Sequence, residues 1–360
     1  MADLASVARG LEGRPYPAYR ALEGSWSLGD IELSVDHVQG DPFAAPSRLS
    51  LVVPTGIPTH WLATRTLREA AEDFLLRRFG ASLAGERRGS GRSGELGVYR
   101  PGPEICERSA VRIDRAGRAT VRFTAGLPAR GRRILGREAA DLLTGDVPAA
   151  AGALRVGEHT GLRAHLDSVV RQRALRDALK GAGLVAFIAD GSVLPRASGV
   201  SQDPLPGAVP FESPPSLRTT LDTPFGPVLG MGVPAGVTVL TGGGFHGKST
   251  VLQALQRGHF DHVPGDGREG VVTTPHAVKV RAEDGRAVRD VDIGDFLGDL
   301  PGGRTTSPFR TDDASGSTSQ AAAMVEAIET GAKVLLLDED TSATNLLVRD
   351  ARMAALIPDD

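Results

Sequence analysis

The chain has 360 residues, of which 41% are hydrophobic and 24% charged, and its formal net charge is −3. This length is sufficient for two or more domains that each bury a core, and no run approaches the roughly 20 apolar residues that span a bilayer. A single cysteine, Cys106, excludes an internal disulfide. We therefore expect a protein of the cytoplasm that has no membrane segment.

The first 160 residues are predicted to form a mixed α/β domain. Alternating polar and apolar residues at 31–38 and 111–123 favour half-buried strands, and residues 49–53 form a short apolar run. Residues 61–79 have a helical pattern. The stretch 85–102 is rich in Gly, Ser and Arg and is expected to be an exposed loop.

Arginine dominates the charge of this part of the chain. Residues 1–180 have a net charge of +6, and residues 181–360 have a net charge of −9. Two arginine clusters lie near predicted turns, and such clusters either contact a phosphate backbone or form an ordinary solvated face. They consist of Arg87, Arg88 and Arg92, and of Arg130, Arg132, Arg133 and Arg137. Nucleic acid is therefore a candidate partner, although only 4% of the residues are aromatic and available to stack on bases.

A second domain is expected from residue 161 to residue 360. A helical pattern from Leu162 to Leu179 would connect it to the first domain, since its apolar residues follow one face. An apolar run follows at 184–188. The next stretch, 195–215, is rich in Pro, Gly and Ser and is predicted to be a surface loop.

A phosphate-binding loop is the clearest motif of the chain. The β-branched run 236–240 predicts a strand before it, and a helical pattern follows from residue 251. Glycines at such a junction let backbone N–H groups surround a phosphate at the positive end of a helix, while Lys248 reaches the β- and γ-phosphates and Ser249 binds Mg²⁺. An accidental lysine in a glycine-rich turn is the alternative. The residues predicted to bind ATP are Gly242, Gly243, Gly244, Phe245, His246, Gly247, Lys248, Ser249 and Thr250.

An acidic pair follows a second predicted strand. Four aliphatic residues, 334–337, are typical of a strand buried on both faces of a parallel sheet, and Asp338 and Glu339 lie at its carboxyl end. Asp338 is predicted to hold Mg²⁺ together with Ser249. Glu339 is predicted to be the general base that polarises the attacking water, so Glu339 and Lys248 are the predicted catalytic residues.

The order of these motifs resembles that of ABC-type ATPases. Residues 313–320, Asp-Ala-Ser-Gly-Ser-Thr-Ser-Gln, are similar to the signature loop that opens a helix before the Walker B strand. Residues 338–345 are similar to the stretch from Walker B to the D-loop, with Asp340 in place of the usual proline and Asn345 in place of the usual aspartate. More narrowly, the chain resembles the family of predicted ATPases of the ABC class, through residues 36–43, 241–250, 264–269, 281–286 and 313–320.

This resemblance implies a fold and an activity. The fold would be an α/β P-loop ATPase domain of ABC type, with a mostly parallel sheet flanked by helices, preceded by a mixed α+β N-terminal domain. The activity would be Mg²⁺-dependent hydrolysis of ATP to ADP and phosphate, coupled to closure of a homodimer that sandwiches two nucleotides. Ser315, Gly316 and Ser317 would then bind the γ-phosphate held by the partner. An ordinary helix N-cap is the alternative interpretation of these small residues.

The sequence also departs from the ABC pattern. No glutamine loop is found, and only 22 residues follow Asp338, where related ATPases continue to a switch histidine. The domain is therefore expected to be truncated at its C-terminus. Two further interpretations remain open, a nucleotide-gated binding or scaffold protein without turnover, and an ATPase that acts on RNA or DNA through the arginine-rich domain. The residue that stacks on adenine is also open, with Phe211 and Phe225 as candidates.

Overall fold

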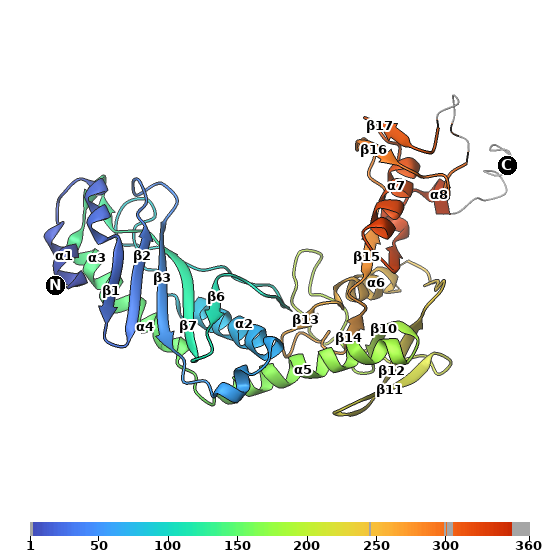
Figure 1. The fold of residues 1–360 in the computed structure, drawn as a ribbon, viewed down its shortest axis with the longest axis horizontal. Helices are drawn as coiled ribbons and strands as arrows, with labels where there is room; N and C mark the ends of the chain where they lie inside the picture. The colour runs from blue at the N-terminus through green and yellow to red at the C-terminus, as the bar shows by residue number, and fades with distance from the viewer. Residues whose placement is uncertain (1–2, 245, 299, 301–304, 348–360) are drawn as a thin grey trace. The chain divides into compact units, whose positions relative to one another are not determined.

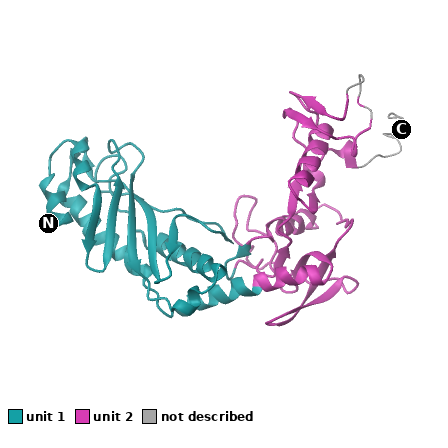
Figure 2. Ribbon diagram, in the orientation of Figure 1, with its two compact units in different colours: residues 1–171, 261–265 teal, residues 172–260, 266–360 magenta. Residues whose placement is uncertain are grey.

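The computed structural model describes residues 3–244, 246–298, 300 and 305–347. The chain divides into two compact units, one of residues 1–171 with 261–265 and the other of residues 172–260 with 266–360 (Figure 2). The helix α5, Thr160–Gly181, crosses this division. The domain boundary expected at residue 160 coincides with the beginning of α5 and remains a proposal.

An antiparallel sheet of six strands forms the centre of the first unit (Figure 1). Buried and exposed side chains alternate along β3 and β7, as the sequence pattern predicted. The predicted run 111–123 is two strands rather than one, because the chain turns between them at Gly117, whose φ is +76°. The sheet contains β1 Gly24–Leu28, β2 Ile31–His37, β3 Ser47–Pro54, β4 Leu96–Gly97, β6 Val111–Ile113 and β7 Arg118–Ala125.

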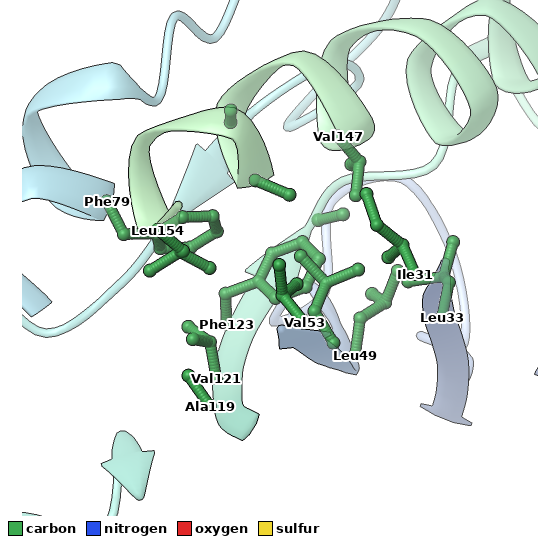
Figure 3. Close-up of a cluster of buried hydrophobic side chains, with 14 of the residues drawn as sticks. Ile31, Leu33, Leu49, Val53, Phe79, Ala119, Val121, Phe123, Val147 and Leu154 are labelled. Atoms are coloured by element: carbon green, nitrogen blue, oxygen red, sulfur yellow. The ribbon is translucent and has the colours of Figure 1, made fainter. Parts of the chain in front are cut away.

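Helices cover one face of this sheet and complete its core. Leu49 and Val53 of β3 and Phe123 of β7 face Val147 and Leu154 from the helical segments (Figure 3). All five side chains are almost fully buried. The helices are α1 Leu4–Gly10, α2 Arg65–Ser82, α3 Gly136–Asp141 and α4 Val147–Ala151, with helical turns η1 Tyr16–Leu22, η2 Thr59–Leu62, η3 Leu142–Asp146 and η4 Gly152–Leu154. Two short strand pairs lie outside this sheet, β5 Glu104–Ile105 with β13 Asp261–His262 and β8 Ala129–Arg130 with β9 Arg133–Ile134.

A buried ion cluster ties α2 to its neighbours in the first unit. The carboxylate of Asp73 has no exposed surface and lies 2.6 Å from Arg77 Nε, 2.8 Å from Arg108 Nη1 and 3.4 Å from His165 Nε2. Burial alone would raise the pKa of Asp73, but its interactions with His165 and Arg77 outweigh burial and hold that pKa below the ordinary value. The cluster is therefore built around an ionised carboxylate.

The second unit begins with an antiparallel sheet in the order β11-β12-β10-β14. β11 and β12 are antiparallel because a turn of two residues joins them, which parallel strands do not permit. Helix α6, Lys248–Arg257, packs on this sheet through Ala254 and Leu255. The strands are β10 Leu184–Ala189, β11 Arg218–Thr223, β12 Gly226–Pro234 and β14 Val271–Thr273.

A parallel strand pair lies further along the second unit. β15, Ala277–Val280, pairs in parallel with β18, Val334–Leu337, and Val280 lies opposite Leu337. A separate core surrounds Ile293 and Phe309 and includes the helix α7, Gly316–Glu329. The remaining elements are β16 Val288–Val291, β17 Phe309–Thr311, the turn η5 Glu339–Thr341 and α8 Thr344–Leu347.

The mixed α/β fold class is confirmed, and two details differ from expectation. Among the described residues, parallel pairing joins β15 to β18, and the larger sheet of this unit is antiparallel. The run 236–240 is not a strand, and Val237 and Val239 are 97% and 72% exposed. β-Branched residues favour a strand mainly through packing against neighbouring strands, and this run lacks such a neighbour within the described chain.

Candidate nucleotide-binding site

The phosphate loop leads from the end of β12 into α6. Gly247 is the N-cap of α6 and has a φ of +85°, a left-handed conformation that favours glycine. The first backbone hydrogen bond of the helix runs from Val251 N to Gly247 O over 2.9 Å. Lys248, Ser249 and Thr250 are half-buried in the first helical turn, where the backbone N–H groups of a helix attract anions.

The side chain of Lys248 is hydrogen-bonded to backbone carbonyls of its own loop. Lys248 Nζ donates hydrogen bonds to Gly242 O at 2.6 Å and to Gly243 O at 2.9 Å. The N–H of Gly243 donates to Nδ1 of His246 over 3.1 Å. These bonds bring together four of the residues predicted to bind ATP, Gly242, Gly243, His246 and Lys248. Phe245 lies outside the described residues.

Helix α6, which follows the phosphate loop, is anchored by buried side chains and hydrogen bonds. Leu252, Ala254 and Leu255 of α6 are buried. Thr273 Oγ1 of β14 donates to Leu255 O over 2.7 Å, and its N–H donates to Gly258 O over 2.9 Å. These bonds satisfy carbonyls at the C-terminal end of α6 and fix the helix on the antiparallel sheet.

The acidic pair lies at the carboxyl end of β18, as predicted. Oδ2 of Asp338 accepts a hydrogen bond from Lys279 Nζ on the parallel strand β15 at 3.0 Å, and both side chains are largely buried. Glu339 is exposed at the beginning of η5. β18 itself is only half-buried, contrary to the expectation of burial on both faces, because β15 is its only strand partner among the described residues.

Sequence reasoning missed Lys279. The available signal was a lysine within the short run 277–280, whose other residues are an alanine and two valines. Its importance follows only from the parallel register, which sets Lys279 beside Leu336 and lets its side chain reach the carboxylate of Asp338.

The predicted signature residues open α7. The side chain of Ser315 accepts a hydrogen bond from Thr318 N and is the N-cap of the helix, so the ordinary capping role is present. Gly316 lies close to the carboxylate of Asp284, since a Cβ added there would be 3.1 Å from Oδ1. Ser317 Oγ donates to Oδ1 of Asn345 over 2.7 Å.

Three loops meet around this helix start. Ala282 N donates to Thr341 O at 2.8 Å, and Glu283 N donates to Ser319 Oγ at 2.8 Å. Residues 281–286 therefore lie between the signature loop and the segment that follows the acidic pair. Within the part of the chain that the structure describes, no hydrogen bond or ion pair joins the phosphate loop to these three loops.

Two family models match the chain. Residues 1–157 match the N-terminal domain described for an ATPase of the ABC class, and residues 158–360 match the P-loop domain of the ABC ATPase model. The chain belongs to the ABC-class ATPase family. This membership confirms the resemblance and the pairing of a P-loop domain with a separate N-terminal domain.

One curated relative of this ABC-class ATPase comes from Methanocaldococcus jannaschii and is described as uncharacterized. It is 36% identical over 191 residues, which are 50% of this chain and 42% of the relative. The match therefore spans less than half of the relative's length. None of the ATPase's described helices is both long and apolar enough to cross a membrane.

The two residues predicted to hold Mg²⁺ carry oxygen atoms that could serve as its ligands. Ser249 and Asp338 offer hydroxyl and carboxylate oxygens, the ligands that this hard cation prefers. Within the described residues, no three His, Cys, Asp or Glu side chains form a cage for a metal ion. A site of one or two protein oxygens suits Mg²⁺, which keeps several waters and binds mainly through nucleotide phosphates.

Proposed function

We propose that this ABC-class ATPase binds ATP with Mg²⁺ in the cytoplasm and hydrolyses it to ADP and phosphate. The observation that carries the proposal is the glycine loop with Lys248 at the beginning of α6, in a chain that also places Asp338 and Glu339 after a parallel strand. Backbone N–H groups and an ammonium are suited to phosphate oxygens, and the acidic pair supplies metal-binding and basic groups.

Each residue has a distinct part in this proposal. Lys248 exchanges the carbonyls of Gly242 and Gly243 for the β- and γ-phosphate oxygens, which are stronger acceptors because they are charged. Ser249 and Asp338 hold Mg²⁺, which neutralises charge on the phosphates. Glu339, whose carboxylate is exposed, accepts the proton of the water that attacks the γ-phosphate.

We also propose that two copies close around two nucleotides. The start of α7 supports this, since Ser315, Gly316 and Ser317 present small side chains and a positive helix end at an accessible surface. In a homodimer this surface of one copy would meet the γ-phosphate in the loop of the other. ATP would then stabilise the dimer, and ADP, which lacks that phosphate, would not.

Phosphate release with Mg-ATP tests this function. We expect the native protein to turn over and Glu339→Gln to lose about 100-fold or more in rate, because positioned general bases contribute that much. Size-exclusion chromatography should show an ATP-dependent dimer for both proteins, more persistent for the variant. Tight ATP binding without any turnover would indicate a nucleotide-gated binding protein instead, and absence of ATP binding would contradict the proposal.

A second candidate function is binding of RNA or DNA through the N-terminal domain. The stretch 85–102, which was predicted to be an exposed loop, is held in place by backbone hydrogen bonds. Ser90 N donates to Ala129 O at 2.7 Å, and Arg92 N donates to Pro42 O at 2.8 Å. Gly91 is required there, because its φ is +60° and an added Cβ would be 2.3 Å from Pro42 O. The backbone that carries these arginines is therefore held in a defined conformation.

Most of these arginines face solvent. Arg88 forms an ion pair with Asp146 at 2.7 Å. Arg92 lies 3.6 Å from Glu95, and the side chains of Arg92 and Glu95 are both about half-exposed. Ser90 Oγ accepts a hydrogen bond from Gly131 N over 2.9 Å, so the second arginine cluster adjoins the first. The exposed Phe43 lies next to Gly91 and provides one aromatic face. Such a surface suits a phosphate backbone.

Salt-dependent binding of a single-stranded oligonucleotide tests this second function. Replacing Arg92, Arg130 and Arg132 with alanine should lower the slope of log affinity against log salt by roughly 2, since each phosphate contact contributes about 0.7. A matched control replaces three exposed arginines elsewhere in the same unit, Arg9, Arg20 and Arg115, and should retain the slope. If the slope falls equally in both triple variants, the oligonucleotide does not bind at the surface formed by Arg92, Arg130 and Arg132.

A further inference from the structure

The first glycines of the phosphate loop are held by two side chains from the loop itself. Residues 236–244 form no strand, so no paired strand within the described chain fixes their backbone. Among the described residues, the hydrogen bonds of this stretch are those with Lys248 and His246. The position of Gly242 and Gly243 therefore depends on these two side chains.

The imidazole of His246 lies against the backbone that it binds. A Cβ added to Gly243 would lie 3.2 Å from Cε1 and 3.4 Å from Nδ1 of the ring. Glycine at this position therefore leaves the room that the ring needs for its close approach. Because Nδ1 accepts the N–H of Gly243 over 3.1 Å, it carries no proton, and the proton of the neutral ring is on Nε2.

Nucleotide binding acts differently on the two side chains. In the proposed ATP complex, Lys248 exchanges the carbonyls of Gly242 and Gly243 for phosphate oxygens. The bond between the N–H of Gly243 and Nδ1 of His246 takes no part in this exchange. It is therefore the contact that keeps the backbone of Gly243 beside the turn from which α6 begins.

We propose that His246 is a positioning residue that preorganises the phosphate loop for the phosphates of the nucleotide. This inference rests on the proposed binding of ATP and adds a side chain that acts without touching the phosphates. His246 directly precedes the N-cap of α6, and its bond to Gly243 limits the conformations of the loop before the nucleotide arrives. Less conformational entropy is then lost on binding, and ATP and ADP gain equally because both carry the β-phosphate.

Two substitutions of His246 that differ in one respect test this role. Asparagine places a carbonyl oxygen where the imidazole has Nδ1, whereas leucine has nearly the same shape and no acceptor. His246→Leu should weaken binding of ATP and ADP by about fivefold, the contribution of one hydrogen bond between neutral groups, and His246→Asn should stay within about twofold of the native protein. His246 is exposed, so neither substitution removes a core contact. Titration with fluorescent ATP and ADP analogues in the presence of Mg²⁺ measures these affinities.

Steady-state phosphate release gives a second readout. A preorganised loop binds the phosphates equally in the ground state and the transition state, so His246→Leu should raise KM about fivefold and leave kcat unchanged.

The asparagine variant separates positioning from a direct contact, because asparagine has no atom at the place of Nε2. Equal weakening of nucleotide binding by His246→Asn and His246→Leu would indicate a direct contact from the ring and would overturn the inference. Native affinity in His246→Leu would overturn it as well. Absence of ATP binding by the native protein would instead overturn the proposed function.

Discussion

Replacing Lys248 with alanine is expected to weaken ATP binding by about 10- to 100-fold. The ammonium is the only charged group of the phosphate loop in the described residues, and hydrogen bonds to charged groups contribute roughly 1.5–3 kcal/mol each. Its present partners, the carbonyls of Gly242 and Gly243, belong to the loop, so the substitution also loosens the loop. Titration with a fluorescent ATP analogue in the presence of Mg²⁺ measures the effect.

A second lysine provides the control for this experiment. Lys333 is exposed and lies just before β18, so Lys333→Ala removes the same charge from the same unit without touching the loop. The affinity of the Lys333→Ala variant for the ATP analogue should match that of the native protein within about twofold. Equal weakening by the two substitutions would show that overall charge, rather than the loop, governs binding.

Removal of the Asp73 carboxylate should have the largest effect on the stability of the first unit. Asp73→Ala leaves Arg77, Arg108 and His165 without their shared buried partner, and loss of one partner from a buried ion pair costs about 3–5 kcal/mol. Both tryptophans, Trp26 and Trp61, lie in this unit. Tryptophan fluorescence during urea unfolding therefore reports the stability of the unit by itself.

The same cluster predicts a dependence on pH. The pKa of Asp73 in the folded state lies below its ordinary value of 3.8, so the carboxylate contributes its full stabilisation above that value. This contribution is lost as the pH falls through the lower folded-state pKa. The stability difference between the native protein and Asp73→Ala should accordingly shrink only below about pH 4.

Asp167 offers a matched control for Asp73. It pairs with Arg163 at 3.0 Å on the same helix, α5, that carries His165, but both side chains are about half-exposed. Exposed pairs contribute roughly 0–1 kcal/mol, so Asp167→Ala should be nearly neutral. If Asp73→Ala loses no more unfolding free energy than Asp167→Ala, the ion cluster around Asp73 does not stabilise the unit.

The sequence predicted best those features that are local. The phosphate loop is contiguous, and glycine positions, lysine and following helix can all be recognised within ten residues. Alternating burial in β3 and β7 was equally predictable, because a strand with one buried face repeats every two residues. Family resemblance added the order of the motifs and the separate N-terminal domain.

Features that depend on pairing between distant segments were not predictable. Lys279 and Asp338 are 59 positions apart, and only the register of β15 against β18 brings them together. The run 236–240 has the composition of a strand, but composition does not determine whether a neighbour is present. The bond between Ser317 and Asn345 likewise follows from how α8 packs on α7, which no local pattern encodes.

The pair of Lys279 and Asp338 gives the proposed Mg²⁺ site a resident counterion. The ammonium already neutralises the carboxylate at 3.0 Å in largely buried surroundings, so an incoming cation must displace it rather than simply fill a negative site. Free Mg²⁺ gains little from that exchange, because it must also shed tightly held water. Mg²⁺ that arrives with nucleotide gains phosphate ligands as well, and we expect the site to discriminate against free divalent cations for this reason.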